Sequence, residues 1–317
     1  MSAVLLKLGS RTSPLAMTQT RIVRAALAQA HGLSGAEAES ALPILPINTT
    51  GDRILDRRLA EAGGKGLFTK ELDEALLDGR IDVAIHSMKD VPTLLPDGIA
   101  IAAVPPRADP RDVLICRVAK TVRDLPQGAV LGTSSARRQS QALYIRPDLK
   151  IVLLRGNVDT RLSKVESAEI DATFLAAAGL NRLGREVAIA TLVDSTEMPP
   201  ACGQGALAVT TRSNDARAKE MVSAIGDETA YIEITAERAF LEALDGSCRT
   251  PIATHASIHA GRLKFVGEAL SLDGKHRWRR QADLQIGESA INLARAVGLA
   301  AGLEIRQDAG DLLPLGD

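Results

Sequence analysis

The segment 80–92 constrains the fold most strongly, because an apolar run and a polar cluster follow one another directly there. Residues 81–85 are almost entirely apolar, and this pattern predicts a strand buried on both faces of a sheet. Four polar side chains come next: His86, Ser87, Lys89 and Asp90. Ligands of open α/β sheets bind at the carboxyl ends of strands, so the segment predicts an α/β protein with a site at this strand end. A solvated turn after a core strand is the alternative.

The length of the chain predicts more than one domain. It has 317 residues, and single hydrophobic cores stop growing near about 250–300 residues, so we expect two or three domains. A content of 45% hydrophobic and 24% charged residues is typical of a water-soluble globular protein, and no apolar run approaches the roughly 18 residues of a membrane span. The net charge of −1 and the 2% aromatic content argue against nucleic acid as a partner.

Neither the N-terminus nor the cysteines indicate export. The first ten residues have no basic region ahead of their short apolar run, so residues 5–8 predict a first strand. The cysteines are widely spaced and odd in number, which argues against disulfides and against a metal site: they are Cys116, Cys202 and Cys248. We therefore expect a cytoplasmic protein without a bound metal, in which Cys116 is a small buried apolar residue.

One local pattern recurs along the chain, a strand that ends in Ser or Thr followed by an arginine near the start of a helix. The arginines in this position are Arg11, Arg137, Arg138, Arg155 and Arg161. Helix N-termini attract anions, and guanidinium groups bind carboxylates or phosphates through paired hydrogen bonds. We therefore expect two α/β lobes around a cleft that binds a small polyanion. At each single position the alternative is an ordinary capped helix beside a solvated arginine.

Two proline-containing stretches divide the chain. Residues 105–112 and 199–205 predict hinges, and the apolar run 206–210 predicts a return to the first sheet. The predicted domains are a first lobe (1–105 and 206–224), a second lobe (106–205) and a C-terminal α/β domain (225–317). The glycines around Lys65 lack the spacing of a phosphate-binding loop, so we expect a lid or a close approach to a ligand there.

Seven motifs in this order cover nearly the whole chain. They are 11–16 (RTSPLA), 63–68 (GGKGLF), 86–92 (HSMKDVP), 132–139 (GTSSARRQ), 154–157 (LRGN), 160–162 (TRL) and 203–206 (GQGA). This set closely resembles the hydroxymethylbilane synthases, also called porphobilinogen deaminases. The resemblance implies two lobes like type II periplasmic binding proteins and a smaller C-terminal α/β domain.

The resemblance also implies an activity and a cofactor. These enzymes join four porphobilinogen molecules head to tail, release ammonia each time, and form the linear tetrapyrrole hydroxymethylbilane for haem biosynthesis. The chain grows on a dipyrromethane cofactor, which a cysteine holds through a thioether. Each porphobilinogen carries an acetate and a propionate, so the predicted arginines suit the growing product, since a hydrogen bond to a charged group contributes roughly 1.5–3 kcal/mol. Porphobilinogen is then the only expected partner, and a monomer is expected.

The matched motifs assign roles to individual residues. The catalytic residues are Asp90 and Lys89. The residues that bind the cofactor are Cys248, Lys65, Asp90, Thr133, Ser134, Ser135, Arg137, Arg138, Arg155 and Gly156. The residues that bind substrate are Arg11, Ser13, Arg155, Arg161, Arg182 and Gln204. For the hydroxyl, lysine and glutamine side chains, the alternative is a cap, lid or turn residue.

Asp90 is expected to stabilise the cation that forms as each pyrrole ring joins. The role of Lys89 stays open between proton delivery and carboxylate binding. Spacing alone does not choose between Cys202 and Cys248 as the attachment site. The resemblance selects Cys248, although Gly246-Ser247 precedes it where the family often has two glycines. His86 is expected to be a structural hydrogen-bonding group.

Two other classes of protein compete with this assignment. A non-catalytic solute-binding protein also has two α/β lobes around an anion-binding cleft, although most such proteins are exported. A nucleic-acid-binding module is disfavoured by the net charge and the aromatic content.

Overall fold

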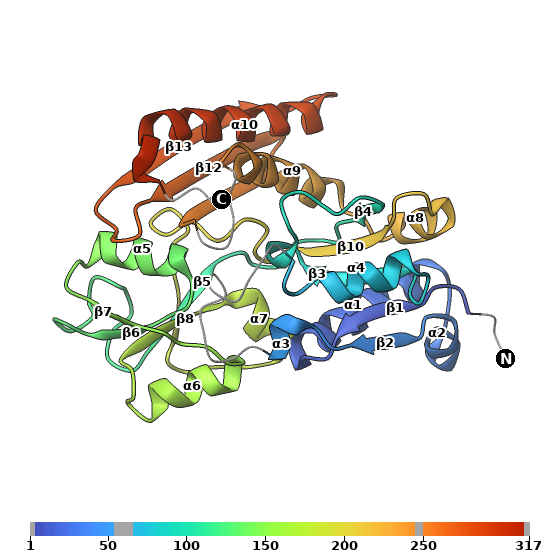
Figure 1. The fold of residues 1–317 in the computed structure, drawn as a ribbon, viewed down its shortest axis with the longest axis horizontal. Coiled ribbons are helices and arrows are strands. Elements are labelled where there is room, and N and C mark those ends of the chain that lie inside the picture. The colour runs from blue at the N-terminus through green and yellow to red at the C-terminus, as the bar shows by residue number, and fades with distance from the viewer. Residues whose placement is uncertain (1–3, 54–65, 245–249, 314–317) are drawn as a thin grey trace. The chain divides into compact units, whose positions relative to one another are not determined.

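The structure is a computed structural model that describes residues 4–53, 66–244 and 250–313 (Figure 1). Contacts divide the chain into two compact units. Unit 1 consists of Met1–Ile54, Gly64–Ala108 and Gly205–Tyr231, and unit 2 of Leu55–Gly63, Asp109–Gln204 and Ile232–Asp317. The division into three domains stays a prediction.

Unit 1 contains a five-stranded mixed sheet with the order β2-β1-β3-β10-β4. Its strands are β1 (Leu8–Arg11), β2 (Ile44–Ile47), β3 (Val83–Ser87), β4 (Ile99–Ala103) and β10 (Leu207–Arg212). Strand β1 is parallel to β2 and β3, whereas β10 is antiparallel to both β3 and β4. The predicted return of the chain to the first sheet after the second hinge is therefore confirmed.

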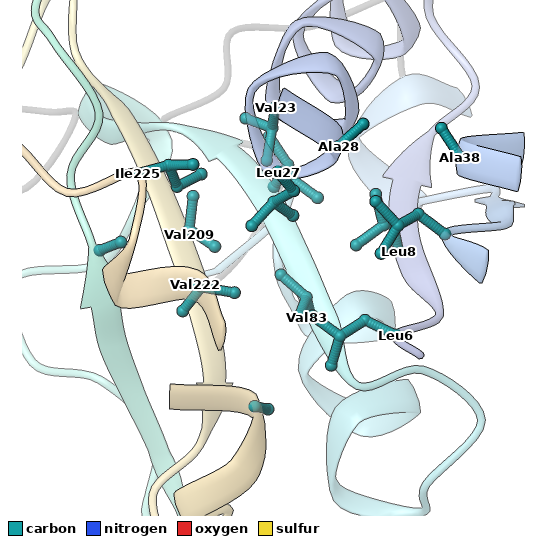
Figure 2. Close-up of a cluster of buried hydrophobic side chains, with 14 of the residues drawn as sticks. Leu6, Leu8, Val23, Leu27, Ala28, Ala38, Val83, Val209, Val222 and Ile225 are labelled. Carbon is teal, nitrogen blue, oxygen red and sulfur yellow. The ribbon is translucent and has the colours of Figure 1, made fainter. Parts of the chain in front are cut away.

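Helices cover both faces of this sheet, because alternate residues of its strands are buried on opposite sides. The helices of unit 1 are α1 (Pro14–Ala30), α2 (Gly35–Ala41), α3 (Thr50–Arg53), α4 (Lys70–Leu77) and α8 (Ala216–Ser223). Leu8 and Val83 pack with Val23 and Leu27 of α1 in the core of Figure 2. Ala84, on the opposite face, belongs to the core that α4 covers. Each fully buried leucine or valine side chain stabilises the fold by about 1.5–3 kcal/mol.

The first sheet of unit 2 has the order β7-β6-β8-β5-β9. Its strands are β5 (Asp112–Cys116), β6 (Val130–Gly132), β7 (Lys150–Val152), β8 (Ala172–Ala176) and β9 (Ala190–Leu192), and its helices are α5 (Ala136–Ile145), α6 (Val158–Glu166) and α7 (Ala177–Arg182). Strand β5 is antiparallel to its neighbours β8 and β9, and β6 is parallel to β7 and β8. Cys116 is buried in this core, as predicted.

A three-stranded antiparallel sheet completes unit 2. It contains β11 (Ile252–His259), β12 (Arg262–Leu270) and β13 (Arg277–Gln285), followed by α10 (Ala290–Ala309) and the short η2 (Gly310–Leu312). Helix α10 lies along β12 and β13 in Figure 1, and α9 (Glu228–Ala243) packs in the same core, where Phe240 meets Phe265 edge to face. The predicted α/β class, with two mixed sheets and a smaller C-terminal α/β part, is therefore confirmed.

Helix α5 ties the two sheets of unit 2 together. Gln141 donates from Nε2 to Glu268 Oε1 at 3.0 Å, and Ser140 donates from Oγ to the Leu272 carbonyl at 3.2 Å. A Cβ on Gly274 would lie 2.7 Å from the Ser140 carbonyl oxygen, so only glycine allows this close approach. The N-terminal end of α5, where several predicted site residues lie, is thereby held in place by the C-terminal sheet.

In the part of the chain that the structure describes, no helix is long and apolar enough to cross a membrane.

Candidate functional site

The carboxylate of Asp90 lies beside the guanidinium group of Arg11. Asp90 ends η1 (Met88–Asp90), the single helical turn that follows β3, and its Oδ2 is 3.7 Å from Arg11 Nη1. The residues meet because β1 and β3 are adjacent and parallel, so their carboxyl ends share one edge of the sheet. The strand that carries Arg11 runs over Leu8–Arg11 and not over residues 5–8, so Arg11 belongs to the strand and not to the turn. The side chain of Asp90 is 29% exposed and therefore accessible to a ligand.

Phe68 supports Arg11 from its other side. The Arg11 guanidinium carbon lies 4.2 Å from the centroid of the Phe68 ring, a cation–π contact worth about 0.5–2 kcal/mol. Gly51 makes room for this ring, because a Cβ there would come within 2.4 Å of it. Arg11 is thus held between an aromatic face and a carboxylate.

A small pocket opens at this strand end. Its lining comprises Arg11, Ala16, Gln19, Phe68, Ile85, His86, Ser87 and Asp90. Gln19 donates from Nε2 to Ser87 Oγ at 2.9 Å. His86 is buried, with Nε2 3.2 Å from Thr210 Oγ1, and burial, together with the charge of Arg11, lowers its pKa to about 4. His86 is therefore neutral at pH 7, in agreement with the structural role expected for it.

The other predicted residues of unit 1 have simpler surroundings. Lys89 is exposed on η1. Ser13 is the N-cap of α1, since its Oγ accepts a hydrogen bond from the Ala16 N–H at 3.3 Å. The expectations for Lys65 and Cys248 fall outside the described residues.

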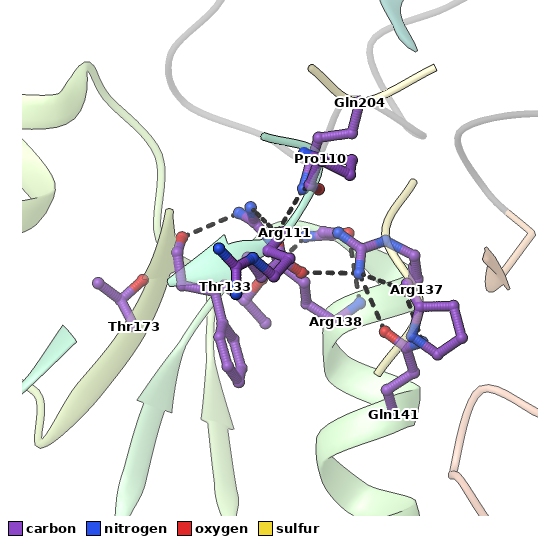
Figure 3. Close-up of polar contacts among 12 residues, drawn as sticks. Pro110, Arg111, Thr133, Arg137, Arg138, Gln141, Thr173 and Gln204 are labelled. Atoms are coloured by element: carbon purple, nitrogen blue, oxygen red, sulfur yellow. Dashed lines mark hydrogen bonds and ion pairs between the residues drawn. The ribbon is translucent and has the colours of Figure 1, made fainter. Parts of the chain in front are cut away.

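In unit 2, Arg137 and Arg138 are buried against a carboxylate that the sequence did not single out. Asp112, the first residue of β5, accepts hydrogen bonds from Arg137 Nη1 at 2.8 Å and from Arg138 Nη2 at 2.7 Å. Gln204 donates from Nε2 to the same carboxylate and to the Pro110 carbonyl, each at 2.8 Å. The side chains of Arg137, Arg138 and Gln204 converge in Figure 3. The structure thus brings three predicted site residues together.

The guanidinium groups of Arg155 and Arg161 adjoin this cluster. Arg161 donates from Nε to the uncharged Gly156 carbonyl at 3.1 Å. Burial lowers the pKa of Arg161 to about 10, and the positive charges of Arg138 and Arg155 lower it as well. Burial also lowers the pKa of Arg182. Like charges gathered at a partly buried site favour an anionic ligand, because an anion relieves their mutual repulsion.

The hydroxyl residues of the 133–135 turn shape the start of α5. Thr133 Oγ1 accepts a hydrogen bond from the Ser135 N–H at 3.1 Å, and Ser135 is the N-cap of α5, with its Oγ 3.4 Å from the Arg138 nitrogen. Ser134 is half-buried beside them. Gly156 has φ of 115°, a conformation that favours glycine, directly before the Asn157 cap of α6.

This arrangement fits a molecule that carries several carboxylates. The Nε atoms of Arg137 and Arg138 are buried and have no hydrogen-bond partner among the described residues. A buried donor without an acceptor costs about 1–3 kcal/mol, which a ligand oxygen would recover. The described residues contain no group of three or more His, Cys, Asp or Glu side chains placed to hold a metal ion.

Sequence reasoning missed Asp112 and Phe68. Asp112 stands in a proline-rich, charged stretch that predicts a hinge, and nothing in that stretch distinguishes it from Asp109. Phe68 belongs to a motif that was noticed for its glycines and lysine. The rarity of aromatic residues, only 2% of the chain, is the signal that could have drawn attention to Phe68.

Comparisons with known proteins agree on one family. Residues 6–220 match the family model described as porphobilinogen deaminase, dipyromethane cofactor binding domain, and residues 231–307 match porphobilinogen deaminase, C-terminal domain. Porphobilinogen deaminase from Phenylobacterium zucineum is 50% identical over 314 residues, 98% of each chain. The protein of that name from Caulobacter vibrioides is 50% identical over 315 residues, again 98% of each chain.

Solved structures match more distantly. YhfZ from Shigella flexneri is 18% identical, with 77% of this chain and 97% of that one covered and a TM-score of 0.37. The GluR0 ligand-binding core in complex with L-glutamate is 12% identical, with 70% and 92% covered and a TM-score of 0.39.

Proposed function

The chain belongs to the porphobilinogen deaminase family and has porphobilinogen deaminase activity (EC 2.5.1.61) in tetrapyrrole biosynthesis, and we propose that Asp90 is its catalytic carboxylate. The observation that carries this proposal is the position of Asp90 at the end of β3, accessible and 3.7 Å from Arg11. Family membership over 98% of the chain rules out the non-catalytic solute-binding protein and the nucleic-acid-binding module considered from the sequence.

Asp90 acts on charge that appears during the reaction. As two pyrrole rings join, positive charge develops on a pyrrole nitrogen, and a carboxylate near that N–H stabilises the transition state more than the ground state. Arg11, with Nη1 3.7 Å from Asp90 Oδ2, orients the carboxylate. Lys89, exposed beside Asp90, either delivers a proton to the leaving amine or binds a carboxylate.

The chain contains a dipyrromethane cofactor binding domain. When bound, the cofactor supplies the pyrrole ring to which substrate rings are added. We assign its carboxylates to Arg137, Arg138 and Arg155, with the start of α5 as a further source of N–H donors. The unpartnered Nε atoms and the concentration of positive charge support this assignment. A hydrogen bond between charged groups contributes roughly 1.5–3 kcal/mol, so a few suffice to hold a small polyanion.

The remaining sequence predictions belong to the same proposal. Covalent attachment through a Cys248 thioether, with Lys65 near the cofactor, rests on the family motifs. So do the roles of Thr133, Ser134, Ser135 and Gly156 around the cofactor. Substrate carboxylates are assigned to Arg11, Ser13, Arg155, Arg161, Arg182 and Gln204.

We also propose a cytoplasmic, monomeric enzyme. Cell fractionation and a mass measurement in solution test these two points.

An Asp90→Asn variant tests the catalytic role. The amide has nearly the same shape but no charge, so turnover should fall on the order of 10²-fold or more. Intact mass should still reveal an adduct of two pyrrole rings, because the covalent bond to the cofactor is assigned to Cys248. Asp97→Asn, an exposed carboxylate of the same unit, is the matched control and should retain turnover. Near-normal turnover of Asp90→Asn would remove Asp90 from its role.

A further inference from the structure

Asp112 uses both carboxylate oxygens inside the protein. Its side chain has 0% exposure, Oδ2 accepts from Arg137, and Oδ1 accepts from Arg138 and Gln204. Burial alone would raise the pKa of Asp112, but the two guanidinium groups outweigh burial and hold the pKa well below its ordinary value. Asp112 is therefore a permanent negative charge at this position.

Asp112 has a rigid base. It opens β5, which lies between β8 and β9, and it pairs with Ala176 of β8. Gln204 also donates to the Pro110 carbonyl, two residues before Asp112. The carboxylate is thus fixed by the sheet and by the returning chain, as a side chain that orients others must be.

The bonds to Asp112 determine which guanidinium atoms remain for a ligand. In Arg138, Nη2 donates to Asp112 and Nη1 to the Phe174 carbonyl at 2.9 Å. In Arg137, Nη1 donates to Asp112, to Gln141 at 3.0 Å and to the Pro199 carbonyl at 3.2 Å. In both arginines Nε is left without a partner among the described residues. A guanidinium group is planar, so fixing its terminal nitrogens fixes the direction of its Nε–H.

The charges lead to the same conclusion. Arg137, Arg138, Arg155 and Arg161 lie in one region, and Asp112 is the carboxylate that pairs directly with two of them. The charge of Asp112 lowers the repulsion among these arginines but leaves a positive excess. Glu268 also acts on Arg137, but it is itself paired with Arg277 and Arg279. Asp112 therefore allows the arginines to gather without cancelling their attraction for an anion.

We propose that Asp112 is a positioning residue of this enzyme, which aims the guanidinium groups of Arg137 and Arg138 at the carboxylates of the bound pyrrole chain. The proposal rests on the carboxylate-binding function assigned to those two arginines above. Asp112 itself touches neither cofactor nor substrate.

The test compares Asp112→Asn with Asp109→Asn. Asp109, three residues before Asp112 in the same connection, is the matched control, because it also pairs with an arginine, Arg111. Each variant is purified without cofactor and mixed with porphobilinogen, and intact mass spectrometry follows the adduct of two pyrrole rings. Misplaced arginines should slow the loading of Asp112→Asn on the order of 10²-fold, whereas Asp109→Asn should load as the unchanged protein does. In protein that has loaded, KM for porphobilinogen should rise more than kcat falls, because Gln204, which is assigned to substrate, also donates to Asp112.

A double-mutant cycle separates positioning from general stability. Arg138→Gln alone should slow loading, and Arg137→Gln/Arg138→Gln should slow it more. Adding Asp112→Asn to that double variant should slow loading further by no more than about 3-fold, because both guanidinium groups that Asp112 positions are already gone. A multiplied effect, or wild-type loading by a folded Asp112→Asn, would overturn the positioning role. Wild-type loading by Arg138→Gln would instead overturn the proposed function of Arg138, and this inference with it.

If Asp112→Asn does not fold, a second variant tests the positioning role of Asp112. Asp112→Glu keeps the charge but moves the carboxylate by one methylene, so it should fold and load at least about 10-fold more slowly. Circular dichroism establishes the folding of each variant before loading is measured. A folded Asp112→Glu that loads at the wild-type rate would contradict the proposal, because the position of the carboxylate would then not matter.

Discussion

Replacing Asp73 by asparagine should stabilise the protein at neutral pH. Asp73 lies in the first turn of α4 with only 7% of its surface exposed. Burial raises its pKa from 3.8 to about 6, with a smaller contribution from the negative charge of Glu74. A difference of about 2 pKa units, at 1.36 kcal/mol per unit, corresponds to about 3 kcal/mol of destabilisation when the group is ionised. Asparagine carries no charge, so the expected net gain at neutral pH is this same amount, about 3 kcal/mol.

The pH dependence of this gain follows from the direction of the pKa shift. Below pH 3.8 the carboxyl group is neutral in the folded and unfolded chains, so the destabilisation is absent. It grows between pH 3.8 and about 6, and it is complete above pH 6. Urea unfolding of both proteins by circular dichroism at pH 4.5 and pH 8 measures the difference. Hydrogen exchange of the β1 and β3 amides assigns it to unit 1.

Asp78 provides the control on the same helix. It is the C-cap of α4, and hydrogen bonds from the backbone and side chain of Arg80 lower its pKa. Asp78→Asn should therefore leave the stability at pH 8 unchanged or lower it. An Asp73→Asn protein no more stable than the parent at pH 8, or equally stabilised at both pH values, would refute the argument.

Two further predictions concern the pocket of unit 1. Phe68→Leu keeps the apolar contact with Gly51 but removes the cation–π contact with Arg11, which is worth about 0.5–2 kcal/mol. The value of kcat/KM for porphobilinogen should therefore fall by about 2- to 30-fold. Unchanged steady-state kinetics would show that Phe68 does not hold Arg11. His86→Gln should leave the pH profile of kcat unchanged between pH 6 and 9, because a pKa of about 4 keeps the His86 ring neutral over that range. A shifted profile would mean that His86 titrates during the reaction.

Local sequence patterns predicted the parts of the fold that depend on neighbouring residues. The apolar run 81–85 predicted a buried strand, and the rule on strand ends predicted a site near Asp90; the structure adds that Arg11 lies 3.7 Å from this carboxylate. The boundary of β1 was wrong by three residues, because the Ser10-Arg11 pair, polar by composition, continues the pairing with β2.

Long-range pairing could not be predicted in this way. Arg137 and Arg138 were recognised as anion-binding residues, but a pattern does not show which anion a guanidinium group meets. The burial of Asp112 against them depends on β5 lying between β8 and β9. Asp112 and Arg137 are 25 residues apart in the sequence, and only the folded chain shows that they meet.

The contact of α5 with the C-terminal sheet limits which parts of the chain can be removed in an engineered version. A two-lobe protein suggests that the last ninety or so residues are dispensable, and that a fragment without them would serve as a simple receptor for anions. Such a fragment would lack Glu268, the hydrogen-bond partner of Gln141, and would expose the surface of α5 that Gly274 touches. This surface lies on the same helix as the arginines that the receptor needs. The C-terminal part should therefore be retained in any minimal version of this scaffold.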